Sequence, residues 1–407
     1  MTDPVRILYL APCWPSEQSF GLQQRTCHIG TALQAIGSVE CIVVRTDYAG
    51  APRPEVEQAI PVRQSIRLRP VANRSLQERL RCSFDVTFLD YFGTTAVDED
   101  RRSVLTSLPR YDLVWIHQLP TANLFGQWKW PNSVLDLDDV PSTLIRSVLR
   151  STRQPARLLK AAAHWYIARR RERRLAERFN VISVCSERDR QYLGFPRHLH
   201  VIPNGFPRPT SEPTRRVANP PRIGYIGTLD YPPNLFGVNW FIREVWHRIK
   251  AELPQARLRL IGKGSNDAQL SGGLEIDRLG WLQDAAEEIS TWAVMIVPVR
   301  RGAGTRIKIA EGFSRKCPVV ATSLGAFGYE VSSDNELHLA DSADAFARAC
   351  VTVATQPVAA AALAERAWNR YQQKWTWEAI RPAIWAAAED CLRRNQRPNS
   401  SCAVSHP

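Results

Sequence analysis

Glycines, cations and a carboxylate occur close together in the stretch PVRRGAGTRIKIAEGFSRKCPVVAT, residues 298–322. An apolar strand is expected to end at Pro298, and a helix is expected to begin near Thr305. Gly302 and Gly304 lie in the loop between them, where glycine lets backbone N–H groups approach a ligand. Because a helix N-terminus also carries a partial positive charge, this loop is suited to binding an anion such as a phosphate.

Two charged side chains follow just inside that helix. Lys308 and Glu311 are three residues apart and therefore share one helix face. An ammonium group at this place can pair with a phosphate, and a carboxylate can hold a ribose diol. The same spacing also fits a plain glycine turn followed by a surface Lys–Glu pair, because a G-x-G loop alone is a weak signal.

Polar side chains also follow the expected strands of the first half. Gly21 and Arg25 come after the first strand, and His117 comes directly after the run LVWI. Ligands of parallel α/β sheets bind beyond the carboxyl ends of the strands. Gly21 would let its loop pass close to donor phosphates or an acceptor, and Arg25 would meet an anion. A helix start with a surface arginine, and a structural histidine, fit these positions equally well.

Three carboxylates end the next strand of the first half. Asp136 and Asp138 share one face of the strand because strand side chains alternate, while Asp139 belongs to the following loop. One of them can serve as a helix cap. Three together at the edge of a cleft indicate a site that holds hydroxyl groups or assists proton transfer.

Short apolar runs alternate with helical patterns along most of the chain, which predicts two α/β domains built on parallel sheets. The strands expected in the first half are residues 6–10, 40–44, 113–116, 134–137, 181–184 and 200–202. Those expected in the second half are 222–226, 257–261, 293–297, 319–321 and 337–339. Asn234 is the expected N-cap of a helix whose buried stripe is Val238, Phe241, Ile242, Val245 and Ile249.

A proline-rich stretch separates the two halves and predicts the domain boundaries. We expect an N-terminal domain over 1–205, a linker over 206–221 and a C-terminal domain over 222–372. A last helix over 373–394 is expected to pack back on the first domain, and the polar tail 395–407 is expected to be disordered.

These segments together resemble the signature of retaining GT-B glycosyltransferases of the family-4 type, the bacterial group 1 sugar transferases. In that family a glycine-rich loop leads to K-x-x-E-A/G and then to P-V-V-A-T, which here are residues 308–312 and 318–322. Further pieces in the same order are HVIPNG (200–205), IGYIGT (223–228), RLRLIG (257–262) and LGW (279–281). The resemblance extends from Val5 to about Leu392.

The resemblance implies two Rossmann-like domains facing a central cleft, with the nucleotide-sugar donor on the C-terminal one. The implied donor-binding residues are Gly227, Thr228, Leu279, Gly302, Ala303, Gly304, Thr305, Arg306, Lys308 and Glu311. From their positions we expect acceptor contacts at Gly21 and Arg25 and catalytic roles for His117, Asp138 and Asp139, and the family often has a histidine in the place of His117. It also implies no bound metal and no cofactor beyond the UDP- or GDP-sugar substrate.

One departure from the family pattern concerns the donor sugar. The family pairs two glutamates eight residues apart, and the first would fall at Ala303. The loss of that carboxylate affects the sugar contact, although the loop backbone still offers hydrogen bonds. Arg306 lies about 200° around a helix from Lys308, so it can join the diphosphate site only from a frayed first turn.

The formal charge of +13 and the pI near 9.6 favour an anionic partner. Residues 146–178 hold eleven Lys or Arg and two Glu beside a stripe of Leu158, Leu159, Ala162, Trp165, Tyr166 and Ala168. This pattern fits an amphipathic helix on an anionic membrane surface or near a lipid-linked acceptor, and it equally fits a solvated surface helix. Nine scattered cysteines without a C-x-x-C pair, and a start without signal-peptide features, predict a cytoplasmic protein, peripheral on the membrane through that segment.

The sequence thus predicts a metal-independent glycosyltransferase of polysaccharide or glycoconjugate biosynthesis. It would transfer a sugar with retention to a glycan, lipid-linked or small-molecule acceptor. A nucleotide-sugar 2-epimerase of GT-B-like fold is the alternative enzyme. A basic nucleic-acid-binding protein is the alternative of another class, prompted by charge alone, and the chain carries none of the usual nucleic-acid-binding signatures.

Overall fold

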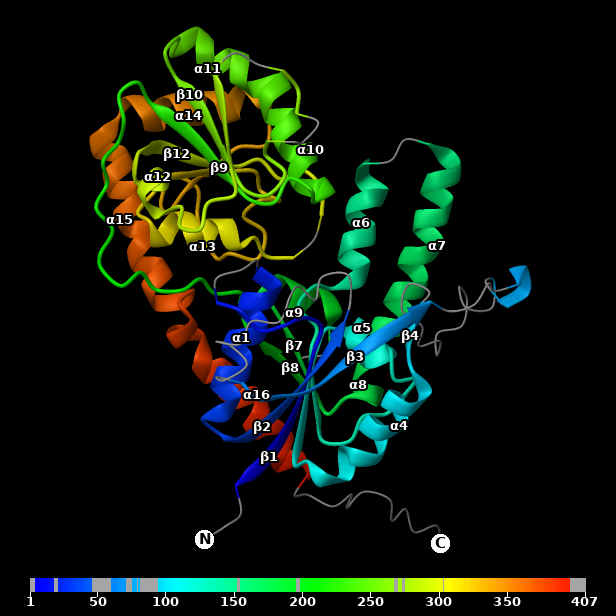
Figure 1. Cartoon of the computed structure of the whole chain (residues 1–407). Coiled ribbons are helices and arrows are strands. Elements are labelled where there is room, and N and C mark those ends of the chain that lie inside the picture. Colours follow the sequence, from blue (N-terminus) through cyan, green and yellow to red (C-terminus); the bar gives the residue numbers. More distant parts are fainter. Residues whose placement is uncertain are drawn as a thin grey trace, which may run out of the picture. The chain divides into compact units, whose positions relative to one another are not determined.

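The computed structural model describes residues 4–17, 21–45, 60–70, 75–78, 80, 94–151, 154–194, 198–266, 270–272, 275–302 and 304–395. The chain divides into two compact units (Figure 1). The first comprises the chain up to Pro203 together with the segment from Arg381 onward, and the second comprises Asn204–Ile380. The first unit is therefore discontinuous in sequence.

An eight-stranded sheet forms the centre of the first unit, in the order β4-β3-β2-β1-β5-β6-β7-β8. Its strands are β1 Val5–Ala11, β2 Gly37–Arg45, β3 Val62–Pro70, β4 Thr94–Ala96, β5 Leu113–His117, β6 Ser133–Asp136, β7 Val181–Val184 and β8 Leu199–Val201. Neighbouring strands are parallel except β3 and β4. β5, β6 and β7 are buried along their whole length, as expected of strands covered by helices on both faces.

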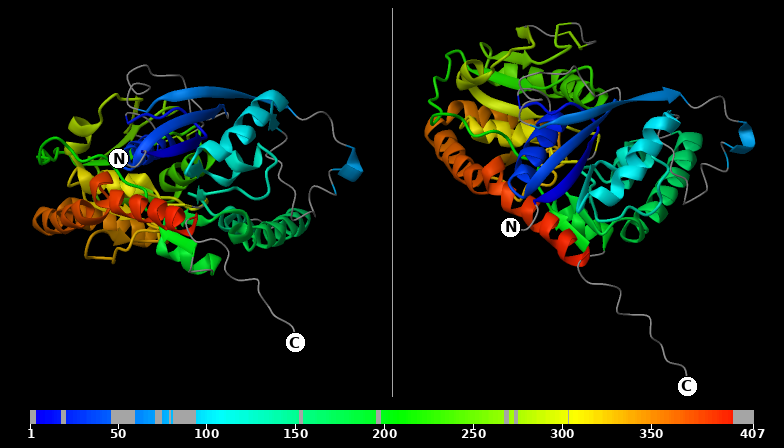
Figure 2. Two further views of the ribbon diagram at one scale, coloured as in Figure 1. Left: turned by 90° about the horizontal axis from the view of Figure 1, so that it is seen from below. Right: turned by 60° about the horizontal axis from the view of Figure 1, so that its bottom comes forward.

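The helices of this unit are α1 Gly21–Gln34, α4 Asp98–Ser107, η1 Leu108–Arg110, α5 Leu119–Asn123, α6 Pro141–Ser151, α7 Pro155–Glu172, α8 Leu175–Arg178 and α9 Glu187–Leu193. α6 and α7 lie side by side as a hairpin (Figure 1). The last helix, α16, spans Trp377–Asn395 and contains Pro382. Its residues from Arg381 onward belong to the first unit and lie along α1 (Figure 2), where Trp385 Nε1 donates to Ala32 O over 2.9 Å.

The second unit contains a six-stranded sheet in the order β11-β10-β9-β12-β13-β14, in which all paired strands are parallel. Its strands are β9 Arg222–Ile226, β10 Arg257–Ile261, β11 Ile276–Gly280, β12 Trp292–Val297, β13 Val319–Ala321 and β14 His338–Leu339. Its helical segments are α10 Pro232–Trp240, η3 Phe241–Trp246, α11 His247–Glu252, α12 Ala286–Ser290, α13 Ile307–Ser314, α14 Ala343–Thr355 and α15 Pro357–Lys374. Two parallel-sheet, Rossmann-like units of this kind confirm the predicted GT-B fold class.

Several local predictions differ from the structure. Strands β3, β4 and β11 were not predicted. Asn234 is not an N-cap, because α10 already begins at Pro232 with Tyr231 before it. α13 begins at Ile307, two residues after the expected start. The predicted stripe from Val238 to Ile249 is buried, as expected.

The proline-rich stretch 206–221 belongs to the second unit. It holds no helix or strand, and a single bridge pairs Phe206 with Thr376. The N–H of Arg216 donates to Ser290 O and that of Ala218 to Thr291 O, both over 2.9 Å. These bonds replace the sheet and helix partners that the prolines exclude.

Among the described residues, no single helix is long and apolar enough to span a membrane. The pair α14 and α15 meets the length and composition criteria jointly, with a bend of 103° between the two helices. The seven cysteines within the described ranges are all buried and carry free thiols.

Candidate active site

In the second unit, the loop after β9 and the start of α13 are in direct contact. Gly227 adopts a φ of +148°, and a Cβ at this position would lie 2.5 Å from Cε and 2.6 Å from Nζ of Lys308. Glycine is therefore required here, because a larger residue would displace the lysine. The predicted donor residues Gly227 and Lys308, 81 positions apart in the sequence, thus form one site.

A hydrogen-bonded chain fixes the ammonium group of Lys308. Its Nζ donates to Asn234 Oδ1 over 3.1 Å, and Asn234 Nδ2 donates to the carbonyl of Thr228 over 2.8 Å. The ammonium also lies 5.4 Å from the centre of the Tyr225 ring. Asn234 and Tyr225 were not predicted as site residues, since the P-P-N sequence was interpreted as a helix cap. They belong to the site because the start of α13 packs against the end of β9, a contact that the local sequence does not predict.

Burial shifts the pKa values of both Lys308 and Glu311. Burial lowers the pKa of Lys308 to about 8, and repulsion from Arg306 adds to the effect. Burial raises the pKa of Glu311 to about 7, against the opposing charges of Arg315 and Lys308. Within the described residues no carboxylate lies at ion-pair distance from Lys308. A bound phosphate would supply the missing counter-charge.

The loop before α13 is held in conformations that favour glycine. Gly302 and Gly304 have φ values of +117° and +77°, and a Cβ on Gly302 would lie 2.6 Å from the guanidinium of Arg306. Thr305 Oγ1 accepts a 2.8 Å hydrogen bond from Asn204 Nδ2. The loop backbone is thereby anchored at one end, with Ala303 lying outside the described residues.

Arg306 precedes α13 in an extended conformation, with φ −100° and ψ 104°. It is therefore not subject to the helical geometry that would place it opposite Lys308. Its positive charge contributes to the lowered pKa of Lys308. Both can act on one anion.

Leu279 and Gly280 end β11, and the following Trp281 is 63% exposed. The N–H of Gly262 donates to Gly280 O over 2.8 Å, and the N–H of Gly280 donates to Ser265 Oγ over 2.9 Å. These bonds fix the end of β11 beside that of β10, its neighbour in the sheet. Leu279 is half-buried there, at the carboxyl edge where the resemblance predicted the nucleobase.

In the first unit, Arg25 is fully buried and pairs with Asp136. Its Nε and Nη2 donate to the two oxygens of that carboxylate over 2.9 and 2.7 Å. Its remaining donors reach the carbonyls of Ile202 and Pro203, both over 3.1 Å. The prediction that Arg25 contacts an acceptor is therefore wrong for this geometry, because the guanidinium is committed to internal partners. It therefore links α1 to β6 and to the segment that follows β8. Gly21 is the half-buried first residue of α1, at the same edge of the sheet.

His117 ends β5 and is also fully buried. The hydroxyl of Thr26 donates to Leu22 O over 2.9 Å, so it accepts from His117 Nδ1 at 3.0 Å. Nε2 then carries the lone pair. It lies 3.8 Å from Asp136 and 4.0 Å from Asp138, and it has no hydrogen-bond partner in the described part of the chain. Burial lowers the pKa of His117, while both carboxylates act to raise it.

Asp138 is the member of this cluster that reaches the surface, with 13% of its side chain exposed. Its backbone has a φ of +58°, which is strained for a residue with a side chain. Cys185 donates to its Oδ1 over 3.1 Å, and Gln118, itself at a φ of +69°, donates to Oδ2 over 3.5 Å. Asp139, next in the chain, is exposed. The structure thus brings His117, Asp136 and Asp138 together, with the histidine behind the carboxylates. Among the described residues, no group of three or more His, Cys, Asp or Glu side chains is placed so that it could hold a metal ion.

Comparisons with known proteins identify the family and the fold. The family model for a glycosyl transferase 4-like domain matches residues 20–205, and that for glycosyl transferases group 1 matches residues 220–356. No curated protein sequence matches the chain.

Among solved structures, a sucrose-phosphate synthase from Thermosynechococcus elongatus has a TM-score of 0.66 at 17% identity, covering 96% of this chain and 100% of that one. HepE from Anabaena, crystallised with UDP and glucose, has a TM-score of 0.61 at 16% identity, covering 95% and 99%. WaaG, a glycosyltransferase involved in lipopolysaccharide biosynthesis, has a TM-score of 0.59 at 13% identity, covering 94% and 99%. Both halves of the chain match, and the fold is shared over its length: the protein is a GT-B glycosyltransferase that belongs to the group 1 glycosyl transferase family.

Proposed function

We propose that this glycosyltransferase moves a sugar from a nucleoside diphosphate donor to a hydroxyl group with retention of the anomeric configuration. The observation that carries the proposal is the ammonium group of Lys308. It donates a hydrogen bond to Asn234 and is flanked by the glycine loop and Arg306. Among the described residues, no carboxylate lies within ion-pair distance of it. HepE, a structural neighbour, has been crystallised with UDP-glucose, which supports a nucleotide sugar as the donor class.

The chemical task is to stabilise a leaving diphosphate. The bond between the anomeric carbon and the diphosphate oxygen breaks, and the acceptor oxygen forms its bond to the same face of the sugar. The acceptor proton passes to the departing diphosphate, so the products are a glycoside and a nucleoside diphosphate. Lys308, Arg306 and the backbone N–H groups at the start of α13 supply fixed positive charge where negative charge develops. Protein groups alone provide this charge in our proposal, which makes the transfer metal-independent.

Glu311 lies on the same face of α13 and is half-buried. Its carboxylate would accept hydrogen bonds from the ribose hydroxyls of the donor. In the first unit, Asp138 would accept a hydrogen bond from a hydroxyl of the sugar or the acceptor. His117 would act as the positioning residue behind it, because the imidazole has no exposed surface. Asp139, exposed next to Asp138, would contribute to the same acceptor contact.

We further propose that the acceptor is lipid-linked and that the α6–α7 hairpin meets an anionic membrane. Apolar side chains are exposed on this hairpin, with Leu159 at 74% and Tyr166 at 58%. Arg157 and Lys160 are exposed on either side of Leu158 and Leu159. Apolar contact and positive charge on one surface are the combination that binds a peripheral protein to anionic lipid.

The transfer is tested with the full chain, a panel of UDP- and GDP-sugars and a lipid-linked acceptor pool. We expect an acceptor product heavier by one sugar residue, with the donor's anomeric configuration by NMR. Lys308→Met should abolish it, whereas the exposed Arg248→Gln should not. An inverted product would refute retention, and full activity of Lys308→Met would refute the donor site. A 2-epimerised nucleotide sugar formed without acceptor would instead establish the epimerase.

The membrane contact is tested by co-sedimentation with vesicles of phosphatidylcholine, with and without phosphatidylglycerol. We expect salt-sensitive binding to the anionic vesicles that is lost in Arg157→Gln/Lys160→Gln. Arg243→Gln/Arg248→Gln removes the same charge from exposed positions of the second unit and should bind like wild type. Equal binding of both variants would mean that the hairpin is only a solvated surface.

A further inference from the structure

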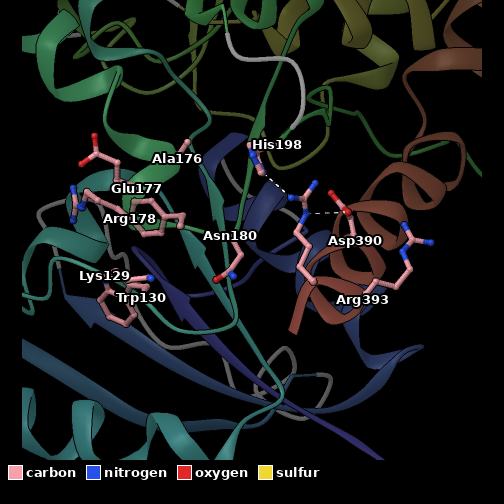
Figure 3. A pocket seen from close by; sticks show the side chains of 11 residues that line it. Lys129, Trp130, Ala176, Glu177, Arg178, Asn180, His198, Asp390 and Arg393 are labelled. Atoms are coloured by element: carbon pink, nitrogen blue, oxygen red, sulfur yellow. Dashed lines mark hydrogen bonds and ion pairs between the residues drawn. The ribbon is translucent and has the colours of Figure 1, made fainter. Parts of the chain in front are cut away.

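A cavity of about 640 Å³ lies in the first unit, and Figure 3 shows the side chains that line it. It is lined by residues that precede β6 and β7, by His198 before β8, and by the C-terminal end of α16. It therefore opens at the amino ends of these strands. His117, Asp136 and Asp138 lie at the carboxyl ends, the opposite edge of the same sheet. The volume falls in the range of small-molecule sites.

The lining is rich in cations. Lys129, Arg178, Arg393 and Arg394 contribute four positive charges, against the two carboxylates of Glu177 and Asp390. Both carboxylates are already paired. Glu177 accepts from Arg174 over 2.8 Å. Asp390 accepts from Arg394 over 3.1 Å and lies 3.2 Å from His200 Nε2. Lys129 and Arg393 are exposed, and no described carboxylate pairs with either.

Arg178 is the strongest single indication of an anionic ligand. It is only 5% exposed, and its guanidinium donates to the carbonyls of Trp128 and Gln127 and to Asn123 Oδ1. These are neutral acceptors, and no carboxylate in the described ranges pairs with this cation. A buried charge without a counter-ion is costly, so an anion in the cavity would relieve it.

Neutral groups in the lining complete a set of hydrogen-bond donors. Asn180 Oδ1 accepts from the Ser133 N–H over 3.0 Å, which leaves its amide N–H₂ for a ligand. Arg394 Nη1 donates to His198 Nδ1 over 2.7 Å, so that ring is held with its proton on Nε2. Trp130 Nε1 is buried without a hydrogen-bond partner in the described part of the chain. Donors outnumber acceptors around the cavity.

We propose that this cavity is a second binding site, which takes a phosphate ester or diphosphate as its ligand. Planar guanidinium groups and an ammonium match phosphate oxygens, and the volume admits a phosphate with an organic substituent. The site lies too far from the catalytic edge to hold the reacting atoms, since β6 separates the two. It is a site for an effector or an anchoring group, and the phosphate belongs either to a soluble ester or to a lipid headgroup.

Calorimetry with inorganic pyrophosphate on the full chain tests the proposal. Because the donor site also binds diphosphate, the titration is compared in wild type, Lys308→Met and Lys129→Gln/Arg393→Gln. We expect two sites in wild type, of which Lys308→Met retains the cavity site. The double variant should weaken that site by about 10-fold or more. Arg243→Gln/Arg248→Gln removes the same charge from the other unit and should leave it unchanged.

Vesicles distinguish the two sources of the phosphate. If pyrophosphate occupies only the donor site, binding to vesicles containing phosphatidic acid that falls in Lys129→Gln/Arg393→Gln would assign the cavity to a lipid headgroup. Loss of all pyrophosphate binding in Lys308→Met, together with unchanged vesicle binding in the double variant, would overturn the proposal. The substituted lysine and arginine are exposed, so the test does not depend on a variant that fails to fold.

Discussion

Replacing Arg25 with Met separates a structural role of this arginine from an acceptor contact. The substitution leaves the Asp136 carboxylate fully buried, with the Ser183 hydroxyl donating to it and His117 Nε2 3.8 Å away. Removing one partner of a buried ion pair costs about 3–5 kcal/mol. For a unit of this size about 2–4 °C is lost per kcal/mol, so the first unit should melt roughly 6–20 °C lower.

Thermal unfolding followed by circular dichroism measures the shift, and hydrogen exchange of peptides from β5 and β6 assigns it to the first unit. Arg25→Met/Asp136→Leu should recover part of the loss, because replacing both partners by apolar groups leaves no unpaired charge. Lys308→Met serves as the control and should lose transfer activity without a comparable drop in stability. A melting temperature within about 2 °C of wild type, with a raised acceptor KM, would refute the structural role of Arg25.

The remaining predictions concern the donor site. Donor affinity should fall about 10-fold per pH unit above pH 8, since bound diphosphate raises the pKa of Lys308 from about 8 and deprotonation removes the charge that binds it. It should also fall below pH 7, where Glu311 takes up a proton. Calorimetric titrations across this pH range test both changes in donor affinity, and Lys308→Arg should remove the fall above pH 8. Glu311→Ala should lower transfer about 10-fold with folding unchanged, because a charged hydrogen bond is worth about 1.5–3 kcal/mol; normal donor affinity in this variant would contradict its assignment. Gly227→Ala should weaken donor binding because the new Cβ meets Lys308, whereas Gly272→Ala, which meets nothing within 4 Å, should not. Equal donor affinities of these two glycine variants would exclude the contact as the cause.

The strands that the sequence predicted most readily are short runs dominated by apolar residues. β1, β5, β7, β9 and β12 are such runs, because burial on both faces favours apolar side chains. In β3 and β11, charged residues interrupt the apolar ones; examples are Arg63 in β3, and Asp277 and Arg278 in β11. Their sequences therefore resemble those of surface loops. Their pairing depends on the neighbouring strand, which a local pattern does not contain.

The candidate site was predictable where glycines and charges lie within one loop. Gly302, Gly304, Lys308 and Glu311 are neighbours in sequence, and their spacing together with the family resemblance indicates an anion site. The roles of Arg25 and Asn234 were not predictable, since each is fixed by a partner far along the chain. Asp136 lies 111 positions from Arg25, and Lys308 lies 74 positions from Asn234. An arginine that binds a ligand and one that binds a buried carboxylate look alike in sequence.

The discontinuity of the first unit has a consequence for protein synthesis. Its strands are complete once Val201 has left the ribosome, yet Trp385 and Asp390, which bond to Ala32 and His200, are made only after the whole of the second unit. All of Asn204–Ile380 must be translated in between, which at roughly 5–20 residues per second takes on the order of 10–35 s. During that interval the surface of α1 that α16 later covers stays open to water and to chaperones. The second unit therefore has its whole chain available before the first unit does.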